Sequence, residues 1–145
     1  MAADAATIHA SAILIGPTAA LIRGPAGSGK SQLVWDLLQS VLPFTRLVAD
    51  DRVYLETCAG RLLMRPAPGL AGMLEIRGLG IRRLPYEPLA AVGLVVDLAA
   101  EDAARHPEAA QTVIGGVSLP RLAVAAGMPA LPLVLATLKA PTAGN

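Results

Sequence analysis

The stretch GPAGSGKS, from Gly24 to Ser31, matches the pattern G-x-x-x-x-G-K-[ST] without interruption. In this pattern the glycines let backbone N–H groups surround phosphates, the lysine reaches the outer phosphates, and the final hydroxyl ligates Mg²⁺. An apolar run at 18–23 precedes the loop and a helical pattern at 31–39 follows it, which is the strand–loop–helix context that the motif requires. A chance glycine-rich turn is the alternative. The residues expected to bind the phosphates are Gly24, Pro25, Ala26, Gly27, Ser28, Gly29, Lys30 and Ser31.

Length and composition indicate one folded domain. The chain has 145 residues, of which 54% are hydrophobic, and this suits a single domain over 1–145 with frayed ends at about 1–6 and 141–145. The apolar residues come in short runs, none near the ~20 residues of a membrane helix. Residues 1–7 resemble neither a secretory signal nor a transit peptide. We therefore expect a cytoplasmic protein without a membrane partner.

Charge and the rarer residue types argue against several other classes. A net charge of +1 and an aromatic content of 3% argue against a nucleic-acid partner. The single cysteine, Cys58, cannot form an internal disulfide, and one cysteine with two histidines argues against a structural zinc site. The partner has to be sought at the phosphate-binding loop.

The remaining pattern predicts a strand-rich α/β fold. Turns are expected at Gly16-Pro17 and Ala59-Gly60, and loops at 66–72 and 82–90. Many short strands around one phosphate-loop helix are less regular than a doubly wound βαβ array, so a strand-rich P-loop core is the expected architecture. The predicted strands lie at 8–15, 18–23, 45–49, 53–57, 61–65, 73–76, 91–98 and 117–124, and the predicted helices at 31–39, 101–110 and 131–139.

Two adjacent carboxylates, Asp50 and Asp51, follow the predicted strand at 45–49, about twenty residues after Ser31. A carboxylate at the end of a strand that follows the loop by about twenty residues can lie beside the γ-phosphate of a nucleotide and its metal ion. Neighbouring side chains at a strand end point to opposite sides, so one can face the site while the other orients nearby backbone. We expect a catalytic role for one of them, with two solvated turn aspartates as the alternative.

A second informative segment is LEIRGLGI at 74–81. In an extended chain Glu75 and Arg77 lie on the same face, and two glycines follow them. A carboxylate beside a guanidinium suits a metal ion together with a phosphate. An exposed ion pair at a sheet edge fits the same pattern equally well.

Together these segments resemble the catalytic domain of the HPr kinase/phosphorylase family. The resemblance rests on His9, GPAGSGKS at 24–31, LVADD at 47–51 and LEIRGLGI at 74–81, in that order. It implies a bacterial ATP-dependent protein kinase that phosphorylates a serine of HPr, the small phosphocarrier protein of the phosphotransferase system. It also implies a fold akin to that of phosphoenolpyruvate carboxykinase.

The resemblance further implies roles for individual residues. Asp51 would be the general base that takes the proton of the attacking serine, with Asp50 as a secondary acidic residue. Lys30 would bind phosphate, and Ser31 with Glu75 would hold Mg²⁺.

The other implied site residues are less closely matched to the family. His9 would be an active-site histidine, although a surface histidine on a first strand is the alternative. The residues Arg77, Gly78, Leu79 and Gly80 would belong to the region that matters for transfer. Arg105 is a loose match to a further family arginine, and a solvated helix arginine fits it as well.

The chain also departs from the family pattern. We expect a short single-domain form without the N-terminal domain of two-domain members, and a homo-oligomer is a further expectation. The arginine-bearing segment that the family links to dephosphorylation would fall at 124–132, whose sequence VAAGMPALP contains no arginine. The sequence therefore predicts a protein kinase with little phosphorylase activity. The alternatives are a small-molecule kinase or P-loop ATPase, and a nucleotide-binding module without transfer activity.

Overall fold

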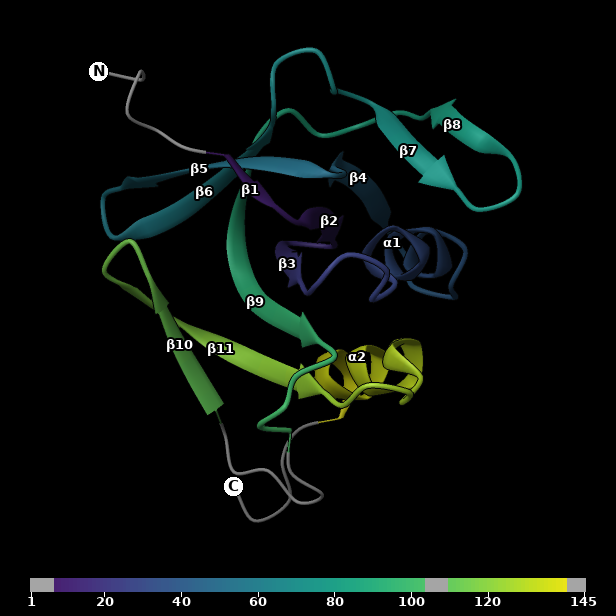
Figure 1. The fold of residues 1–145 in the computed structure, drawn as a ribbon. Coiled ribbons are helices and arrows are strands. Elements are labelled where there is room, and N and C mark those ends of the chain that lie inside the picture. Colours follow the sequence, from purple (N-terminus) through teal and green to yellow (C-terminus); the bar gives the residue numbers. More distant parts are fainter. Residues whose placement is uncertain (1–6, 104–109, 141–145) are drawn as a thin grey trace.

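The computed structural model describes residues 7–103 and 110–140, which form two sheets and two helices (Figure 1). The frayed ends expected at 1–6 and 141–145 lie outside these ranges, and the single-domain organisation stays a prediction. In chain order the elements are β1 (Thr7–His9), β2 (Ser11–Ile15), β3 (Thr18–Arg23), α1 (Lys30–Leu38), β4 (Thr45–Ala49), β5 (Arg52–Cys58), β6 (Arg61–Pro66), β7 (Met73–Ile76), β8 (Gly80–Arg83), β9 (Ala90–Leu98), β10 (Ala110–Ile114), β11 (Val117–Val124) and α2 (Ala130–Lys139).

The larger sheet has nine strands and organises the molecule. Its main path runs β1-β5-β6-β9-β3-β2-β4, and β11 pairs with both β9 and β10. The pairs β3–β9 and β9–β11 are parallel, whereas the hairpins β2–β3, β5–β6 and β10–β11 are antiparallel. The second sheet is the hairpin β7–β8, which stands apart from the main sheet beside α1 (Figure 1). The strand-rich α/β fold predicted from the sequence is thus confirmed.

Most of the predicted elements are also confirmed one by one. Helices α1 and α2 occupy the predicted positions, and β3, β4 and β7 have the predicted bounds. Gly16-Pro17 joins β2 to β3, and Ala59-Gly60 joins β5 to β6, as expected. The strand predicted over 8–15 is interrupted at Ala10, so that β1 pairs with β5 while β2 pairs with β3 and β4.

The helix predicted over 101–110 is wrong in the part that the structure describes. Its first two residues form a turn, and Ala110 begins strand β10. Ala110 pairs with Arg121 of β11, so cross-strand pairing overrides the helix propensity of this alanine-rich segment. Residues 104–109, and with them Arg105, lie outside the described ranges.

A strand also occurs where a loop was expected to begin. Residues 82 and 83, the first two of the loop expected at 82–90, instead end β8, which pairs antiparallel with β7 so that Ile81 lies opposite Glu75. The sequence of β8 does not alternate between apolar and polar residues, and all four of its residues are exposed. The strand exists because β7 provides a pairing edge, which a local pattern cannot indicate.

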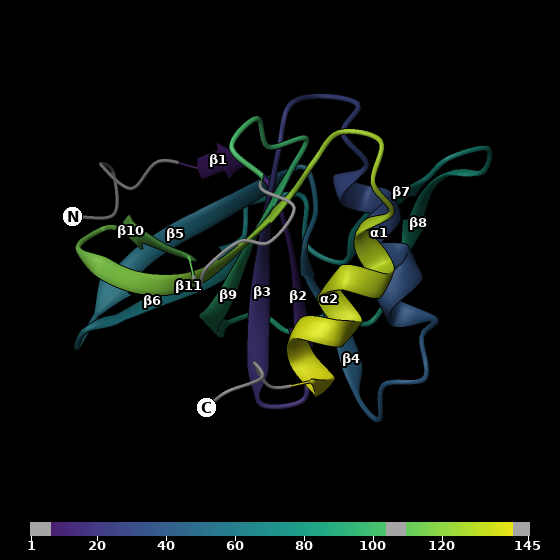
Figure 2. The same cartoon turned by 90° about the horizontal axis from the view of Figure 1, so that it is seen from below.

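The two faces of the main sheet are covered by different elements. On one face Val34 and Leu37 of α1 and Val134 of α2 are fully buried, at 0% exposure, against residues of β2, β3 and β9. Figure 2 shows the two helices side by side, and they contact each other. On the other face Val53 and Met64 of the β5–β6 hairpin complete a second apolar cluster. Among the described residues, no helix is long and apolar enough to cross a membrane.

Parallel pairing brings the carboxyl ends of β3, β9 and β11 to one edge of the sheet. The register pairs Arg23 with Asp97 and Leu98 with Val124. The phosphate-binding loop follows β3 at this edge, and the segments after β9 and β11 begin beside it. In open α/β sheets ligands bind outside the carboxyl ends of the strands, so this edge is where a site is expected.

Asp97 ties the three parallel strands together at this edge. Its carboxylate accepts hydrogen bonds from Arg23 of β3, at 2.7 and 2.8 Å, and from Arg121 of β11, at 2.5 Å. Arg121 also donates to the exposed carboxylate of Asp102, at 2.9 and 3.0 Å. Burial raises the pKa of Asp97, but the hydrogen bonds from Arg23 and Arg121 outweigh that effect and hold its pKa below the ordinary value of 3.8.

Asp97→Asn should therefore lower the free energy of unfolding at pH 7, by about 1–3 kcal/mol, because two guanidinium groups lose a charged acceptor. Since the folded pKa of Asp97 lies below its unfolded value, this stabilisation is complete above about pH 4 and is lost as the pH falls through the folded pKa. Urea unfolding from pH 7 to pH 2 should show the gap between wild type and variant closing in acid. Asp102→Asn is the control and should have a smaller effect, because Asp102 is exposed. A gap independent of pH would contradict this role.

Candidate active site

The phosphate-binding loop forms the turn from β3 to α1, as predicted. A Cβ atom at Gly24 would lie 3.1 Å from the carbonyl oxygen of Leu98, so this position requires glycine for close approach. Gly29 is the N-cap of α1 and has φ +98°, which also favours glycine. Lys30 Nζ donates hydrogen bonds to the carbonyl oxygens of Gly24 (2.7 Å) and Pro25 (3.2 Å). The loop thus brings together a helix N-terminus and an ammonium group, both of which favour a bound anion.

Asp50 is a buried carboxylate beneath this loop. It is 5% exposed and accepts hydrogen bonds from the hydroxyl of Ser11 (2.6 Å), the hydroxyl of Ser31 (2.7 Å) and the backbone N–H of Glu75 (3.3 Å). These three donors come from β2, α1 and β7. Asp50 therefore orients the hydroxyl that ends the phosphate-binding motif and the backbone that carries Glu75.

Asp51 turns away from the core toward solvent. Its side chain is 69% exposed, and its backbone has φ +71°, in the left-handed region. Asp and Asn are among the few non-glycine residues that adopt this conformation readily. The turn is closed by a hydrogen bond from the Arg52 N–H to the Asp50 carbonyl oxygen, at 2.8 Å. The two adjacent carboxylates thus point to opposite sides, and Asp51 is the one that reaches the open cavity.

His9, on β1, lies beside Asp51. Its Nδ1 atom is 3.9 Å from Asp51 Oδ1, and its Nε2 atom is 2.9 Å from an Arg52 guanidinium nitrogen. A guanidinium can only donate, so Nε2 accepts this hydrogen bond and the ring proton belongs on Nδ1, the side that faces Asp51. The Arg52–His9 contact therefore sets the orientation of the imidazole relative to the exposed carboxylate.

The β7–β8 hairpin forms one wall of the site. The prediction that Glu75 and Arg77 lie on the same face of an extended chain is wrong. Strand β7 ends at Ile76, and Arg77 lies in the turn that follows. That turn is closed by a hydrogen bond from the Leu79 N–H to the Ile76 carbonyl oxygen, at 2.9 Å. Leu79 is 62% exposed at its tip. The turn forms because Gly78 and Gly80 both adopt positive φ values, which the strand pattern of the sequence does not indicate.

A cavity of about 850 Å³ brings most of the predicted site residues together. Leu79 and Ser28 do not line it, and Asp50 lies buried behind Ser31. Arg105 falls outside the described residues. The predicted residues that line this cavity, called the active cavity below, are His9, Gly24, Pro25, Ala26, Gly27, Gly29, Lys30, Ser31, Asp51, Glu75, Arg77, Gly78 and Gly80.

The oxygen atoms of this cavity suit Mg²⁺ bound together with phosphates. Ser31 and Glu75 both line it. Both also donate hydrogen bonds to Asp50, Ser31 from its hydroxyl and Glu75 from its backbone N–H. Within the described ranges, no group of three or more His, Cys, Asp or Glu side chains could hold a metal ion. Mg²⁺ usually takes one or two carboxylates, substrate phosphates and waters, so it does not require an all-protein cage. The residues present therefore fit a metal ion that arrives with a nucleotide.

Sequence reasoning missed two residues that hold the site in shape. Ser11 is fully buried and donates to Asp50, and Arg52 donates to His9. Ser11 is the one polar residue in the run Ala10–Ile15, and a polar residue in a buried strand needs a partner, so this signal was available. The role of Arg52 depends on the pairing of β1 with β5 and has no local signal.

Comparisons with known proteins agree with this geometry. A sequence model described as the HPr serine kinase C-terminal domain matches residues 1–85. The chain is 38% identical over 73 residues to the HPr kinase/phosphorylase of Mycoplasma mycoides, and 42% identical over 65 residues to that of Clostridium tetani. These matches cover 50% and 45% of this chain but 22% and 20% of those proteins. The chain therefore spans about a fifth of the length of these curated relatives.

A solved structure is similar over nearly the whole chain. The HPr(Ser) kinase/phosphatase of Coxiella burnetii superposes with a TM-score of 0.76 at 25% sequence identity. The superposition covers 92% of this chain and 93% of that one. The similarity thus extends beyond residues 1–85, into the part of the fold that contains β9, β11 and α2.

Ser11→Ala should raise the Mg²⁺ concentration needed for half-maximal ATP binding by about 3-fold or more, because Asp50 loses a donor and holds Ser31 less firmly. Nucleotide titrations at a series of Mg²⁺ concentrations would measure this. Ser40→Ala is the matched control, since Ser40 donates to the Leu37 carbonyl oxygen at the far end of α1. An equal shift in both variants would mean that the Ser11 hydroxyl has only a general structural role.

Proposed function

This chain belongs to the HPr serine kinase C-terminal domain family, and we propose that it transfers the γ-phosphoryl group of ATP to a serine of an HPr-like phosphocarrier protein. The observation that supports this most directly is the active cavity, in which the phosphate-binding loop and the exposed carboxylate of Asp51 share one open space. An exposed carboxylate is accessible to a hydroxyl on another protein. The relatives' names, HPr kinase/phosphorylase and HPr(Ser) kinase/phosphatase, support the same acceptor.

In the proposed reaction Asp51 accepts the proton of the acceptor serine. The serine oxygen forms a bond to the γ-phosphorus, the bond from that phosphorus to the bridging oxygen breaks, and ADP leaves with the bonding electrons. The Nδ1 side of the His9 ring faces Asp51 at 3.9 Å, and the contact of Arg52 with Nε2 sets that orientation of the ring. The left-handed backbone at Asp51, which aspartate adopts readily, directs the carboxylate into the cavity.

The other residues of the cavity would bind and neutralise the phosphates. Lys30 would move its donors from the loop carbonyls to the outer phosphates, and the Arg77 guanidinium faces the same cavity from the β7–β8 turn. Ser31 and Glu75 would hold Mg²⁺, which would lower the barrier by neutralising charge on the transferred group. Asp50 would hold Ser31 and the backbone of Glu75 in place by accepting their hydrogen bonds, without touching the nucleotide.

Asp51→Asn should reduce the rate of phosphoryl transfer by about 100-fold or more while leaving ATP affinity within about 3-fold. Asparagine tolerates the left-handed backbone, so the substitution removes the proton acceptor and little else. Single-turnover assays with labelled ATP and HPr would measure transfer, and ATP titrations would measure binding. Lys30→Ala should instead reduce both, because it removes a phosphate-binding charge.

Assays without HPr provide the control for Asp51→Asn, since they report hydrolysis by water. Wild-type turnover that does not depend on HPr would point to an ATPase. Full transfer activity in Asp51→Asn would show that another group takes the proton.

We also propose that the reverse reaction, from phosphoserine to inorganic phosphate, is slow or absent. Binding the attacking anion beside a phosphoprotein requires added positive charge or backbone donors. The segment 124–132 contains no arginine, and nearby Arg121 is already paired with Asp97 and Asp102. Purified phosphoserine-HPr incubated with the protein, Mg²⁺ and millimolar phosphate should stay phosphorylated. Dephosphorylation as fast as the forward reaction would overturn this proposal and make Arg77 the first candidate for the anion site.

A further inference from the structure

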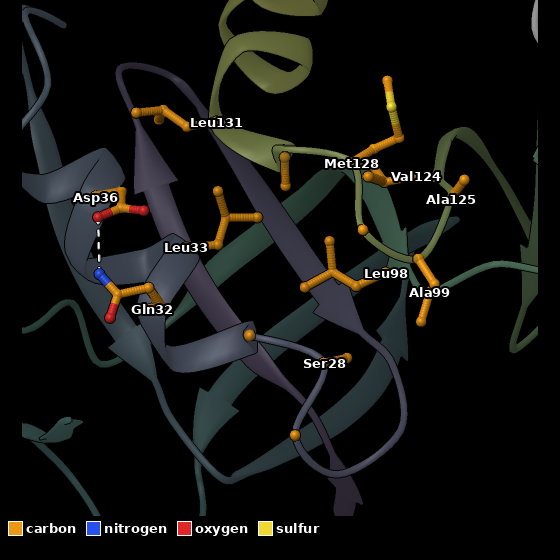
Figure 3. A pocket seen from close by; sticks show the side chains of 15 residues that line it. Ser28, Gln32, Leu33, Asp36, Leu98, Ala99, Val124, Ala125, Met128 and Leu131 are labelled. Atoms are coloured by element: carbon orange, nitrogen blue, oxygen red, sulfur yellow. Dashed lines mark hydrogen bonds between the residues drawn. The ribbon is translucent and has the colours of Figure 1, made fainter.

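A second cavity, of about 330 Å³, lies on the other side of the phosphate-binding loop. Figure 3 shows it enclosed by the loop and α1 on one side and by the segments after β9 and β11 on the other, with the start of α2 above. Its apolar walls include Leu33, Leu98 and Val124, which are 3%, 5% and 2% exposed. Met128, at the rim, is 52% exposed. This volume is at the lower end of the range typical of small-ligand pockets.

The two cavities meet at the loop itself. Gly27, Gly29 and Gln32 line both of them. A ligand whose phosphates occupy the loop can therefore extend one end into each cavity. The active cavity holds Asp51 and Glu75, which suit the outer phosphate, its metal ion and the acceptor. The remaining part of a nucleotide, its sugar and base, is left to enter the second cavity.

The chemistry of the second cavity suits a flat, weakly polar group. Among the described residues, its lining contains no aromatic and no basic side chain, and Asp36 is the one charged residue. The Asp36 carboxylate accepts a hydrogen bond from Gln32 Nε2 at 2.9 Å, drawn as a dashed line in Figure 3. A carboxylate has room for several donors, so Asp36 can also accept from an N–H group at the edge of a base. A second phosphate or a carboxylate ligand would be repelled there.

We propose that this second cavity binds the purine base and sugar of the phosphate donor, with the base between the apolar walls and Met128 and with its amino group donating to Asp36. The inference deepens the proposed function and rests on it for the identity of the donor. The flexible thioether of Met128 suits contact with a base without fixing one orientation. The specificity for the base then comes from segments at 98–99 and 124–131, which the loop motif does not include.

The test compares ATP with inorganic tripolyphosphate, which can occupy the loop but has no base. Ala126→Phe places a bulky side chain at the rim of the second cavity, where Ala126 is exposed. This variant should weaken ATP binding by about 10-fold or more and leave tripolyphosphate binding unchanged, as measured by calorimetry with Mg²⁺. Ala136→Phe, on an exposed position of α2 outside the cavity, is the matched control and should change neither.

Two further variants keep the inference testable if Ala126→Phe fails to fold. Met128→Ala removes contact area and should weaken ATP, but not tripolyphosphate, by about 3-fold or more. Asp36→Ala should abolish the preference of the wild type for ATP over purine riboside triphosphate, which lacks the amino group. Equal effects on ATP and tripolyphosphate, or undiminished ATP binding in all three variants, would overturn the inference.

None of these measurements requires an acceptor protein, so they are independent of whether HPr is phosphorylated. A failure of HPr phosphorylation with the expected binding pattern would reject the proposed acceptor and keep the base site. Phosphorylation of HPr without the expected binding pattern would support the proposed acceptor and reject the base site.

Discussion

The site depends on the hydrogen bonds that the Asp50 carboxylate accepts. This carboxylate is buried, and no ion pair among the described residues involves it. Hydroxyl and backbone N–H groups satisfy its oxygen atoms with hydrogen bonds instead. Those donors belong to β2, α1 and β7, three elements that are distant in the sequence. A cation bound at Ser31 and Glu75 would meet this negative charge behind its ligands. One carboxylate thus joins the stability of the core to the geometry of the candidate metal site.

Parallel pairing of three strands gives the site its shape. The carboxyl ends of β3, β9 and β11 meet, and the Asp97 hydrogen bonds to Arg23 and Arg121 hold them together just before the phosphate-binding loop. The loop lies between two cavities because the segments after β9 and β11 lie on one side and the β7–β8 hairpin on the other. In the proposed function, phosphoryl transfer takes place in the active cavity, beside the β7–β8 hairpin. The base is bound in the second cavity, beside the segments after β9 and β11.

Local pattern was enough for much of the fold. The Gly24 to Ser31 motif, its flanking strand and α1, and the Ala59-Gly60 hairpin all depend on short-range rules of turn geometry and periodicity. The helix expected at 101–110 is wrong at both of its described ends, where 101–102 form a turn and Ala110 pairs with Arg121 of β11. The strand β8 was missed for the same reason, since its partner β7, and not its own composition, makes it a strand.

The sequence by itself determined the residue types of the phosphate-binding motif and that one of two adjacent aspartates would face outward, because backbone alternation separates neighbouring side chains. Only the tertiary structure decided which one. A left-handed turn exposes Asp51, while Ser11, Ser31 and the Glu75 N–H hold Asp50 in the core. The second cavity was likewise beyond the sequence, because it is made by strand ends that are distant along the chain and meet only through parallel pairing.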